Sequence, residues 1–115
     1  MTRLFAALAA LALLPAAAQA ADGGRVFQLQ CRTCHGAAST AMGPALDGVA
    51  GAKIAARADF AYSKALKAKE GTWTDAALDA YLAAPLKFAP GGRMTTAVAN
   101  PADRAAVIDY LKALK

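Results

Sequence analysis

Apolar residues recur at helical rather than strand spacing along most of this chain. The clearest stretch lies at the C-terminal end, where Asn100 is a good N-cap and Pro101 suits the first helical position. An acid in the first turn and lysines in the last favour the same helix through its dipole. Its buried stripe follows the i, i+3, i+4, i+7 rule: Val107, Tyr110, Leu111 and Leu114.

A first helix is predicted just after residue 21. Asp22 can cap it, and Phe27 is its one large apolar residue. Gly23 lies one turn before Phe27, where a missing side chain would let another backbone approach closely. We therefore expect a tight backbone contact at this glycine.

The middle of the chain predicts two more helices. One is short and covers 62–67. The other covers Asp75–Ala83, with Thr74 as its cap, and Pro85 stops it because proline cannot continue a helix. An apolar face on this second helix includes Leu78 and Tyr81.

Glycine and proline mark two long irregular segments, 36–51 and 88–99, and strand signals are weak. The predicted fold class is therefore an all-α small domain with long loops. Loops of this length are unusual in so small a domain unless they wrap around something.

The N-terminal segment has the three parts of a secretory signal peptide. Arg3 supplies the positive charge, 4–18 is an almost uninterrupted run of Leu and Ala, and Ala18 and Ala20 flank a bulkier residue as a signal peptidase requires. A membrane anchor is the alternative, but the run is short and Pro15 interrupts it. We expect cleavage after Ala20, which leaves a mature domain of 21–115 without a membrane span.

Composition narrows the classes further. The 115 residues allow one small domain, and 57% are hydrophobic, which argues against a disordered chain. One His excludes a multi-histidine metal centre, and two Cys exclude a cage of four thiolates. The formal net charge is +5, which cleavage would lower by one through the loss of Arg3. Large apolar residues are sparse in the mature chain, so we expect a buried cofactor, a metal or a disulfide to complete the core.

The sequence Cys31-Arg32-Thr33-Cys34-His35 supplies the candidate chemistry. A C-x-x-C-H run is the attachment motif of c-type haem: each thiol adds to one vinyl group of the porphyrin, and the histidine faces the iron. The motif therefore predicts one haem c, bound through Cys31 and Cys34, with His35 as a ligand of the iron.

Three other interpretations of this motif remain. A disulfide between Cys31 and Cys34 is possible in an exported protein. A thioredoxin-type redox pair would need a βαβ context, which the sequence does not predict. A zinc site would need further Cys or His ligands, and the chain has none. The export signal favours haem, because covalent attachment follows translocation.

Methionine is the remaining candidate for the second iron ligand. Met42 is too close to His35 in sequence to reach the opposite face easily. Met94 follows Pro90-Gly91-Gly92-Arg93, a loop that presents a residue rather than packing a face. A methionine in an alanine-rich chain is otherwise more often core filler. We therefore predict His35 and Met94 as the metal ligands.

Taken together, these residues resemble a class I cytochrome c, of the bacterial cytochrome c2 and mitochondrial kind. The resemblance covers nearly all of the mature chain and implies the cytochrome c fold, wrapped around one covalently bound haem. It implies that the first helix packs on the last through Gly23 and Phe27. In Gly43-Pro44 it implies that the Pro44 carbonyl accepts a hydrogen bond from the His35 ring, which makes the imidazole a stronger ligand.

The resemblance also assigns three aromatic residues to the cofactor site. Tyr62, in Phe60-Ala61-Tyr62-Ser63, and Trp73, in Thr72-Trp73-Thr74, would donate hydrogen bonds to a buried haem propionate. Tyr81 would sit beside the Met94 sulfur. Trp73 and Tyr62 could instead be ordinary core aromatics, and Tyr81 lies on an apolar helix face in either case.

Four departures from the family pattern bear on the site. The loop between His35 and Pro44 is shorter than in mitochondrial proteins. Ala52 stands where many relatives have an Arg near the propionates, and the loss of that cation should lower the reduction potential. Gly92 stands where relatives often have Thr, which could loosen the Met94 loop, and Thr96 stands where a Phe often covers the haem edge. Both changes could weaken the bond from Met94 to the iron.

These features predict a soluble periplasmic one-electron carrier rather than an enzyme, because two protein ligands leave no open position on the iron. The resemblance implies redox proteins as partners: a cytochrome bc1-type complex or a periplasmic dehydrogenase as donor, and a terminal oxidase, a peroxidase or a photosynthetic reaction centre as acceptor. Arg25, Lys87 and Arg93 could form a basic rim that steers the carrier toward acidic partners. We expect a monomer, and nothing indicates nucleic-acid binding.

Two alternative functions share the haem. The chain could be the haem subunit of a periplasmic dehydrogenase, which predicts a stable heterodimer with an apolar docking patch. It could also be a haem enzyme or gas sensor in which Met94 leaves the iron, which predicts rapid CO binding by the ferrous form.

Overall fold

The computed structural model describes residues 21–115, so the signal peptide predicted at 1–20 lies outside the described residues. This part of the chain is all-α with long loops, as predicted, and its single β-bridge joins Lys53 to Thr72. Its helices are α1 (Gly23–Gln30), α2 (Lys64–Lys67), α3 (Asp75–Ala83), α4 (Pro85–Phe88) and α5 (Pro101–Ala113).

The three longest helices begin where local capping signals predict. The side chains of Asp22, Thr74 and Asn100 each accept hydrogen bonds from backbone N–H groups in the first turn of α1, α3 and α5, respectively. Those N–H groups have no partner within the helix, so the caps fix the start of each helix.

The short helices differ from the prediction. The helix expected over 62–67 begins only at Lys64, because the Ser63 hydroxyl accepts the backbone N–H of Leu66 and makes Ser63 the cap. Pro85 ends α3 as predicted, but it also starts α4, which was not predicted. Proline fits the first position of a helix, where its missing N–H has no partner to lose.

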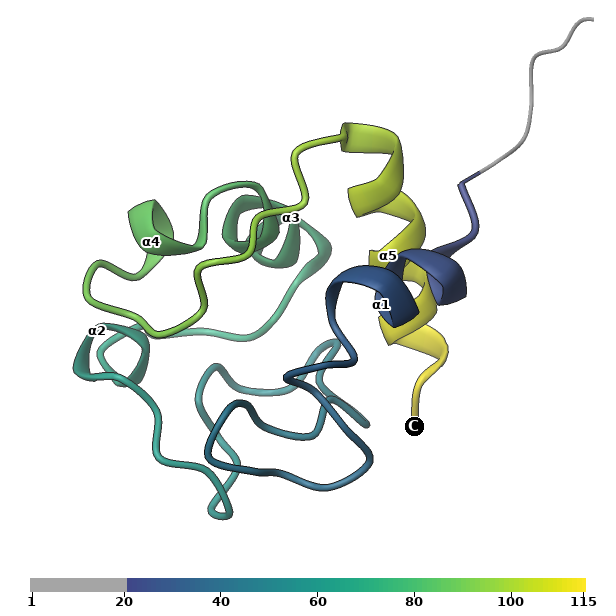
Figure 1. Cartoon of the computed structure of the whole chain (residues 1–115). Helices are drawn as coiled ribbons and strands as arrows, with labels where there is room; N and C mark the ends of the chain where they lie inside the picture. Colours follow the sequence, from purple (N-terminus) through teal and green to yellow (C-terminus); the bar gives the residue numbers. More distant parts are fainter. Residues whose placement is uncertain (1–20) are drawn as a thin grey trace, which may run out of the picture.

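Helices α1 and α5 cross on one side of the molecule (Figure 1). Gly23 lies directly against the backbone of Ala106, where a Cβ atom would stand 2.7 Å from the Ala106 carbonyl carbon. One turn on, the Phe27 and Tyr110 rings pack with their centroids 5.0 Å apart. The contact predicted between the first and last helices is therefore present, and it depends on the missing side chain at Gly23.

The last helix buries a slightly different face from the one predicted. Val107 and Leu111 are buried, and Tyr110 and Leu114 are half-buried at its margin. Ile108, which the predicted stripe omits, is also buried. The face is broader because α5 packs on both α1 and α3.

Helices α2 and α4 lie on the opposite side of the view from α1 and α5 (Figure 1). The long loop after α1 fills the lower part of that view, and the loop between α4 and α5 runs from its left side to the start of α5 at the top. No helix in residues 21–115 has the length and apolar character needed to cross a bilayer.

Candidate cofactor site

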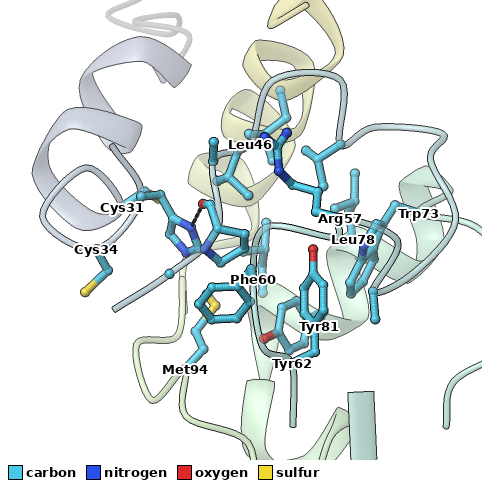
Figure 2. Close-up of a pocket in the computed structure, with 18 of the residues that line it drawn as sticks. Cys31, Cys34, Leu46, Arg57, Phe60, Tyr62, Trp73, Leu78, Tyr81 and Met94 are labelled. Atoms are coloured by element: carbon cyan, nitrogen blue, oxygen red, sulfur yellow. Dashed lines mark hydrogen bonds between the residues drawn. The ribbon is translucent and has the colours of Figure 1, made fainter. Parts of the chain in front are cut away.

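A cavity lies between the loops and the inner faces of α1, α3 and α5 (Figure 2). Its walls include every residue for which the sequence predicts a role in the site: Cys31, Cys34, His35, Pro44, Tyr62, Trp73, Tyr81 and Met94. The structure thus brings together residues that lie far apart in the described part of the chain. Their roles toward a cofactor stay predictions.

The two cysteines follow directly on the end of α1. Cys31 is the C-cap of that helix, and its carbonyl accepts the backbone N–H groups of Cys34 and His35 at 3.2 and 2.9 Å. This turn places both thiols and the imidazole on the cavity wall. Both thiols are free, and burial, with a smaller contribution from Cys34, raises the pKa of the Cys31 thiol. Neither cysteine is in a disulfide, so both sulfur atoms can form a covalent bond to another group.

A hydrogen bond fixes the ring of His35. Its Nδ1 lies 2.8 Å from the Pro44 carbonyl oxygen, as drawn by the dashed line in Figure 2. A carbonyl can only accept, so Nδ1 carries the proton, and in the neutral ring Nε2 keeps the lone pair. This arrangement matches the hydrogen bond predicted for Pro44 and leaves Nε2 as the nitrogen that can bind a metal.

Gly43 allows that hydrogen bond to form. A Cβ atom at this position would stand 2.7 Å from the Cys34 carbonyl oxygen and 3.1 Å from two atoms of the His35 ring. The loop can therefore reach the imidazole only because residue 43 has no side chain.

The two methionines of the described chain border the cavity in different ways. Met94 is half-buried and packs against the hydrophobic core, whereas Met42 is 64% exposed. Met94 enters from a turn in which Gly92 donates its N–H to the Ala89 carbonyl and Gly91 adopts a φ of +81°. A positive φ is easy only for glycine, so the Pro-Gly-Gly sequence shapes the loop that carries Met94.

Aromatic rings form another wall of the cavity. Trp73 and Tyr81 line the cavity, and they pack on each other and on Phe88 with centroid distances between 5.1 and 5.7 Å. Burial raises the pKa of the Tyr81 phenol, which therefore stays protonated and can donate a hydrogen bond. Among residues 21–115, the Trp73 indole N–H and the Tyr62 hydroxyl make no hydrogen bond to protein, and neither polar atom is fully buried. Both residues line the cavity, so these donors can serve an acceptor inside it.

A polar cluster beside the cavity was not predicted from the sequence. Arg57 pairs with both carboxylate oxygens of Asp59 and with Asp47, at 2.9 to 3.1 Å. Ser39 donates its hydroxyl proton to Asp59 and accepts the backbone N–H of Ala45. These residues come from separate loop segments and follow no motif, so the sequence offers no signal that they meet.

Acid should weaken this cluster. The hydrogen bond from Arg57, followed by the one from Ser39, lowers the pKa of Asp59 from 3.8 to about 2. Because the pKa of Asp59 is lower in the folded state than in the unfolded state, its ionised carboxylate stabilises the fold at pH values above the unfolded-state pKa. This stabilisation is lost as the pH falls through the folded-state pKa. We therefore expect the Tm to fall between about pH 4 and pH 2 by more in the wild type than in Asp59→Asn. Thermal melts over this range test it. Asp109→Asn, which removes an exposed carboxylate outside the cluster, should keep the wild-type slope.

Comparisons with known proteins agree with the geometry. The family model described as Cytochrome c matches residues 20–115. The chain is 41% identical over 100 residues to cytochrome c2 of Rhodomicrobium vannielii, covering 84% of this chain and 79% of that protein. It is 43% identical over 91 residues to cytochrome c2 iso-1 of Magnetospirillum molischianum, covering 75% and 91%.

A solved structure agrees as well. The fold superimposes on that of cytochrome cH from Methylobacterium extorquens with a TM-score of 0.74 at 39% sequence identity. The match covers 84% of this chain and 99% of that one. The family match, over residues 20–115, includes every residue that lines the cavity.

Proposed function

Because the chain belongs to the cytochrome c family, whose members carry electrons on covalently bound haem c and are not enzymes, we propose that it is a one-electron carrier with His35 and Met94 as ligands of the haem iron. One observation carries the proposal. A single cavity is lined by the Cys31–Cys34–His35 turn and by Met94, which comes from near the other end of the chain.

The residues on the cavity wall fit haem c in three respects. The free thiols of Cys31 and Cys34 provide two attachment points. The hydrogen bond to Pro44 leaves His35 Nε2 with a lone pair for iron. Trp73 and Tyr62 offer hydrogen-bond donors without protein partners among residues 21–115, which a propionate needs when it is buried.

The ligand pair supports electron transfer rather than catalysis. Bound haem supplies an iron that alternates between the ferric and ferrous states. His35 and Met94 together would leave no coordination position for a substrate. The soft thioether of Met94 favours the ferrous state and therefore a high reduction potential. The chain would hold the same ligands in both states, which keeps the reorganisation that accompanies electron transfer small.

The loops around the cavity modify this site in one way that the sequence anticipates. Ala52 lines the cavity without a charge. Two guanidinium groups line it: that of Arg57, whose charge is offset by Asp47 and Asp59, and that of Arg93, which donates to the Ala61 carbonyl. Because residue 52 adds no further cation, a propionate would be less compensated than with an arginine there, which supports a lower potential.

The carrier works with redox proteins, and we assign it to the periplasm. Residues 1–20 would direct export and be removed, leaving 21–115 as the haem domain. Arg25, Lys87 and Arg93 form no ion pair within residues 21–115, unlike the paired Arg57 and Arg104, so they keep an uncompensated charge for acidic partners. The donors in keeping with this location are a bc1-type complex or a periplasmic dehydrogenase, and the acceptors are an oxidase, a peroxidase or a reaction centre.

Replacing Met94 tests the proposal. In the wild-type holo-protein we expect the far-red sulfur-to-iron absorption band in the ferric state and no CO uptake in the ferrous state. Met94→Ala should abolish the band completely and bind CO rapidly, because it removes the thioether while leaving the attachment residues unchanged.

Met42→Ala is the matched control. It removes the other methionine of the mature chain, which is 64% exposed, and should leave the spectrum and the CO response unchanged. A wild-type protein that lacks the band and takes up CO would overturn ligation by Met94. It would favour the haem enzyme or gas sensor instead.

A further inference from the structure

The peptide group between Pro44 and Ala45 is hydrogen-bonded at both ends. Its carbonyl oxygen accepts the proton of His35 Nδ1 at 2.8 Å. Its N–H, on Ala45, donates to the Ser39 hydroxyl oxygen at 2.9 Å. Ala45 is 2% exposed, so water has little access to this peptide. The ring of His35 is thus joined to Ser39 through one rigid, polarisable group.

The chain of hydrogen bonds continues to a carboxylate. The Ala45 N–H can only donate, so the Ser39 oxygen accepts it and its own proton goes to Asp59 Oδ1, 2.9 Å away. The direction of every bond is thereby fixed, from the His35 ring at one end to the Asp59 carboxylate at the other. Each hydrogen bond is donated toward Asp59: His35 donates to the Pro44–Ala45 peptide, that peptide donates to Ser39, and Ser39 donates to Asp59.

Arg57 holds the carboxylate end in place. Its Nε and Nη2 donate to the two oxygens of Asp59 at 3.0 and 2.9 Å, and its Nη1 donates to Asp47 at 3.1 Å. The Asp59 side chain is 53% exposed and would otherwise sample several rotamers. A two-pronged guanidinium contact restricts it to the geometry that reaches Ser39.

We infer that Ser39 and Asp59 are positioning residues for the proposed iron ligand His35, acting through the Pro44–Ala45 peptide. The Ala45 N–H donates to a hydroxyl group that itself donates to a carboxylate. This chain of hydrogen bonds polarises the Pro44–Ala45 peptide and places more negative charge on the Pro44 carbonyl oxygen. The Pro44 oxygen then accepts more strongly from His35 Nδ1, which makes the ring a more basic ligand. A more basic imidazole favours the ferric state, so the relay lowers the reduction potential. This inference rests on the proposed function, since it takes His35 as the ligand.

The hydroxyl of residue 39 can be tested with two variants of nearly equal shape. Ser39→Val replaces the hydroxyl with a methyl group, whereas Ser39→Thr keeps it. In the holo-protein we expect Ser39→Val to raise the ferrous-to-ferric ratio, measured at a fixed applied potential, by about threefold. At 59 mV per tenfold change, this corresponds to a reduction potential about 28 mV higher. The His35 Nδ1–H proton resonance of the ferrous form should move upfield in the same variant. Ser39→Thr should restore both values to those of the wild type.

A second pair separates the relay from simple charge. Asp59→Asn and Asp47→Asn each remove one negative charge from around Arg57, but only Asp59 contacts Ser39. Asp59→Asn should move the His35 Nδ1–H resonance, and Asp47→Asn should leave it in place. Equal effects of the two, or an unmoved resonance in both Ser39→Val and Asp59→Asn, would overturn the inference. The side chains of both aspartates are more than half exposed, so we expect both variants to fold. This pair therefore tests the inference even if Ser39→Val does not form a folded holo-protein.

The failure of the proposed function would look different. Loss of His35 and Met94 ligation would appear in the wild type itself, as an absent far-red band and uptake of CO. Failure of the relay alone would leave that band intact in every variant, with an unchanged Nδ1–H resonance and potential.

Discussion

Alanine at both Cys31 and Cys34 is expected to yield a chain with no covalently bound haem and no cooperative fold. The core of residues 21–115 shows why. Its largest fully buried side chains are two valines, Val98 and Val107, and both line the cavity. Without a group in the cavity, much of the core would lack packing partners on its inner side: Trp73, Leu78, Leu82, Val98, Val107 and Leu111. A domain of this size has too little other apolar contact to compensate.

Two measurements check this result. Mass spectrometry of the denatured chain should show the mass of the polypeptide alone, and far-UV circular dichroism should show little helix and no sigmoidal melt. The single variant Cys34→Ala is the control, because Cys31 still provides one attachment point. It should retain haem and unfold cooperatively, at a lower Tm than the wild type. A double variant with native helix content and a sharp melt would show that the protein core is sufficient without the cofactor.

Local signals account for the parts of the fold that could be predicted. Asp22, Thr74 and Asn100 each satisfy backbone N–H groups within their own first turn, so a few neighbouring residues determine where α1, α3 and α5 begin. The predicted start of α2 is two residues too early, because the Ser63 hydroxyl accepts the Leu66 N–H and caps the helix there. Helix α4 was missed because Pro85 both stops one helix and starts the next.

The candidate site also contains residues that the sequence can identify and contacts that it cannot. Cys31, Cys34 and His35 form a motif whose spacing is set by the porphyrin, so they are recognisable in sequence. Met94 could be proposed because glycine and proline precede it and few other ligands exist in the chain. The Ser39–Asp59 contact could not be proposed. It depends on how two loops meet around the cavity, and no periodicity or spacing encodes that meeting.

Gly23→Ala is expected to destabilise the holo-protein by about 3 kcal/mol, near the upper end of overpacking costs. The new Cβ would overlap the Ala106 carbonyl oxygen, stand 2.7 Å from the carbonyl carbon and lie 3.0 Å from the Tyr110 Cβ. The atoms of Ala106 belong to the backbone of α5 and cannot rotate away, so α1 and α5 would have to separate. That separation would also disturb the packing of Phe27 on Tyr110. We expect the Tm to fall by about 12 to 24 °C for a domain of this length.

The neighbouring glycine provides a control that isolates the steric term. A Cβ atom at Gly24 would lie 3.4 Å from Asp22 Oδ1 and 3.5 Å from the nearest Tyr110 ring atom, which are ordinary contacts. Gly24→Ala should therefore leave the Tm unchanged or raise it, since alanine favours a helix over glycine by about 0.5 to 1 kcal/mol. Gly23 does not line the cavity, so the far-red band of Gly23→Ala should match the wild type below its melting range. Equal melting temperatures for the two variants would mean that α5 yields to the added methyl group, and that the close approach at Gly23 contributes little to stability.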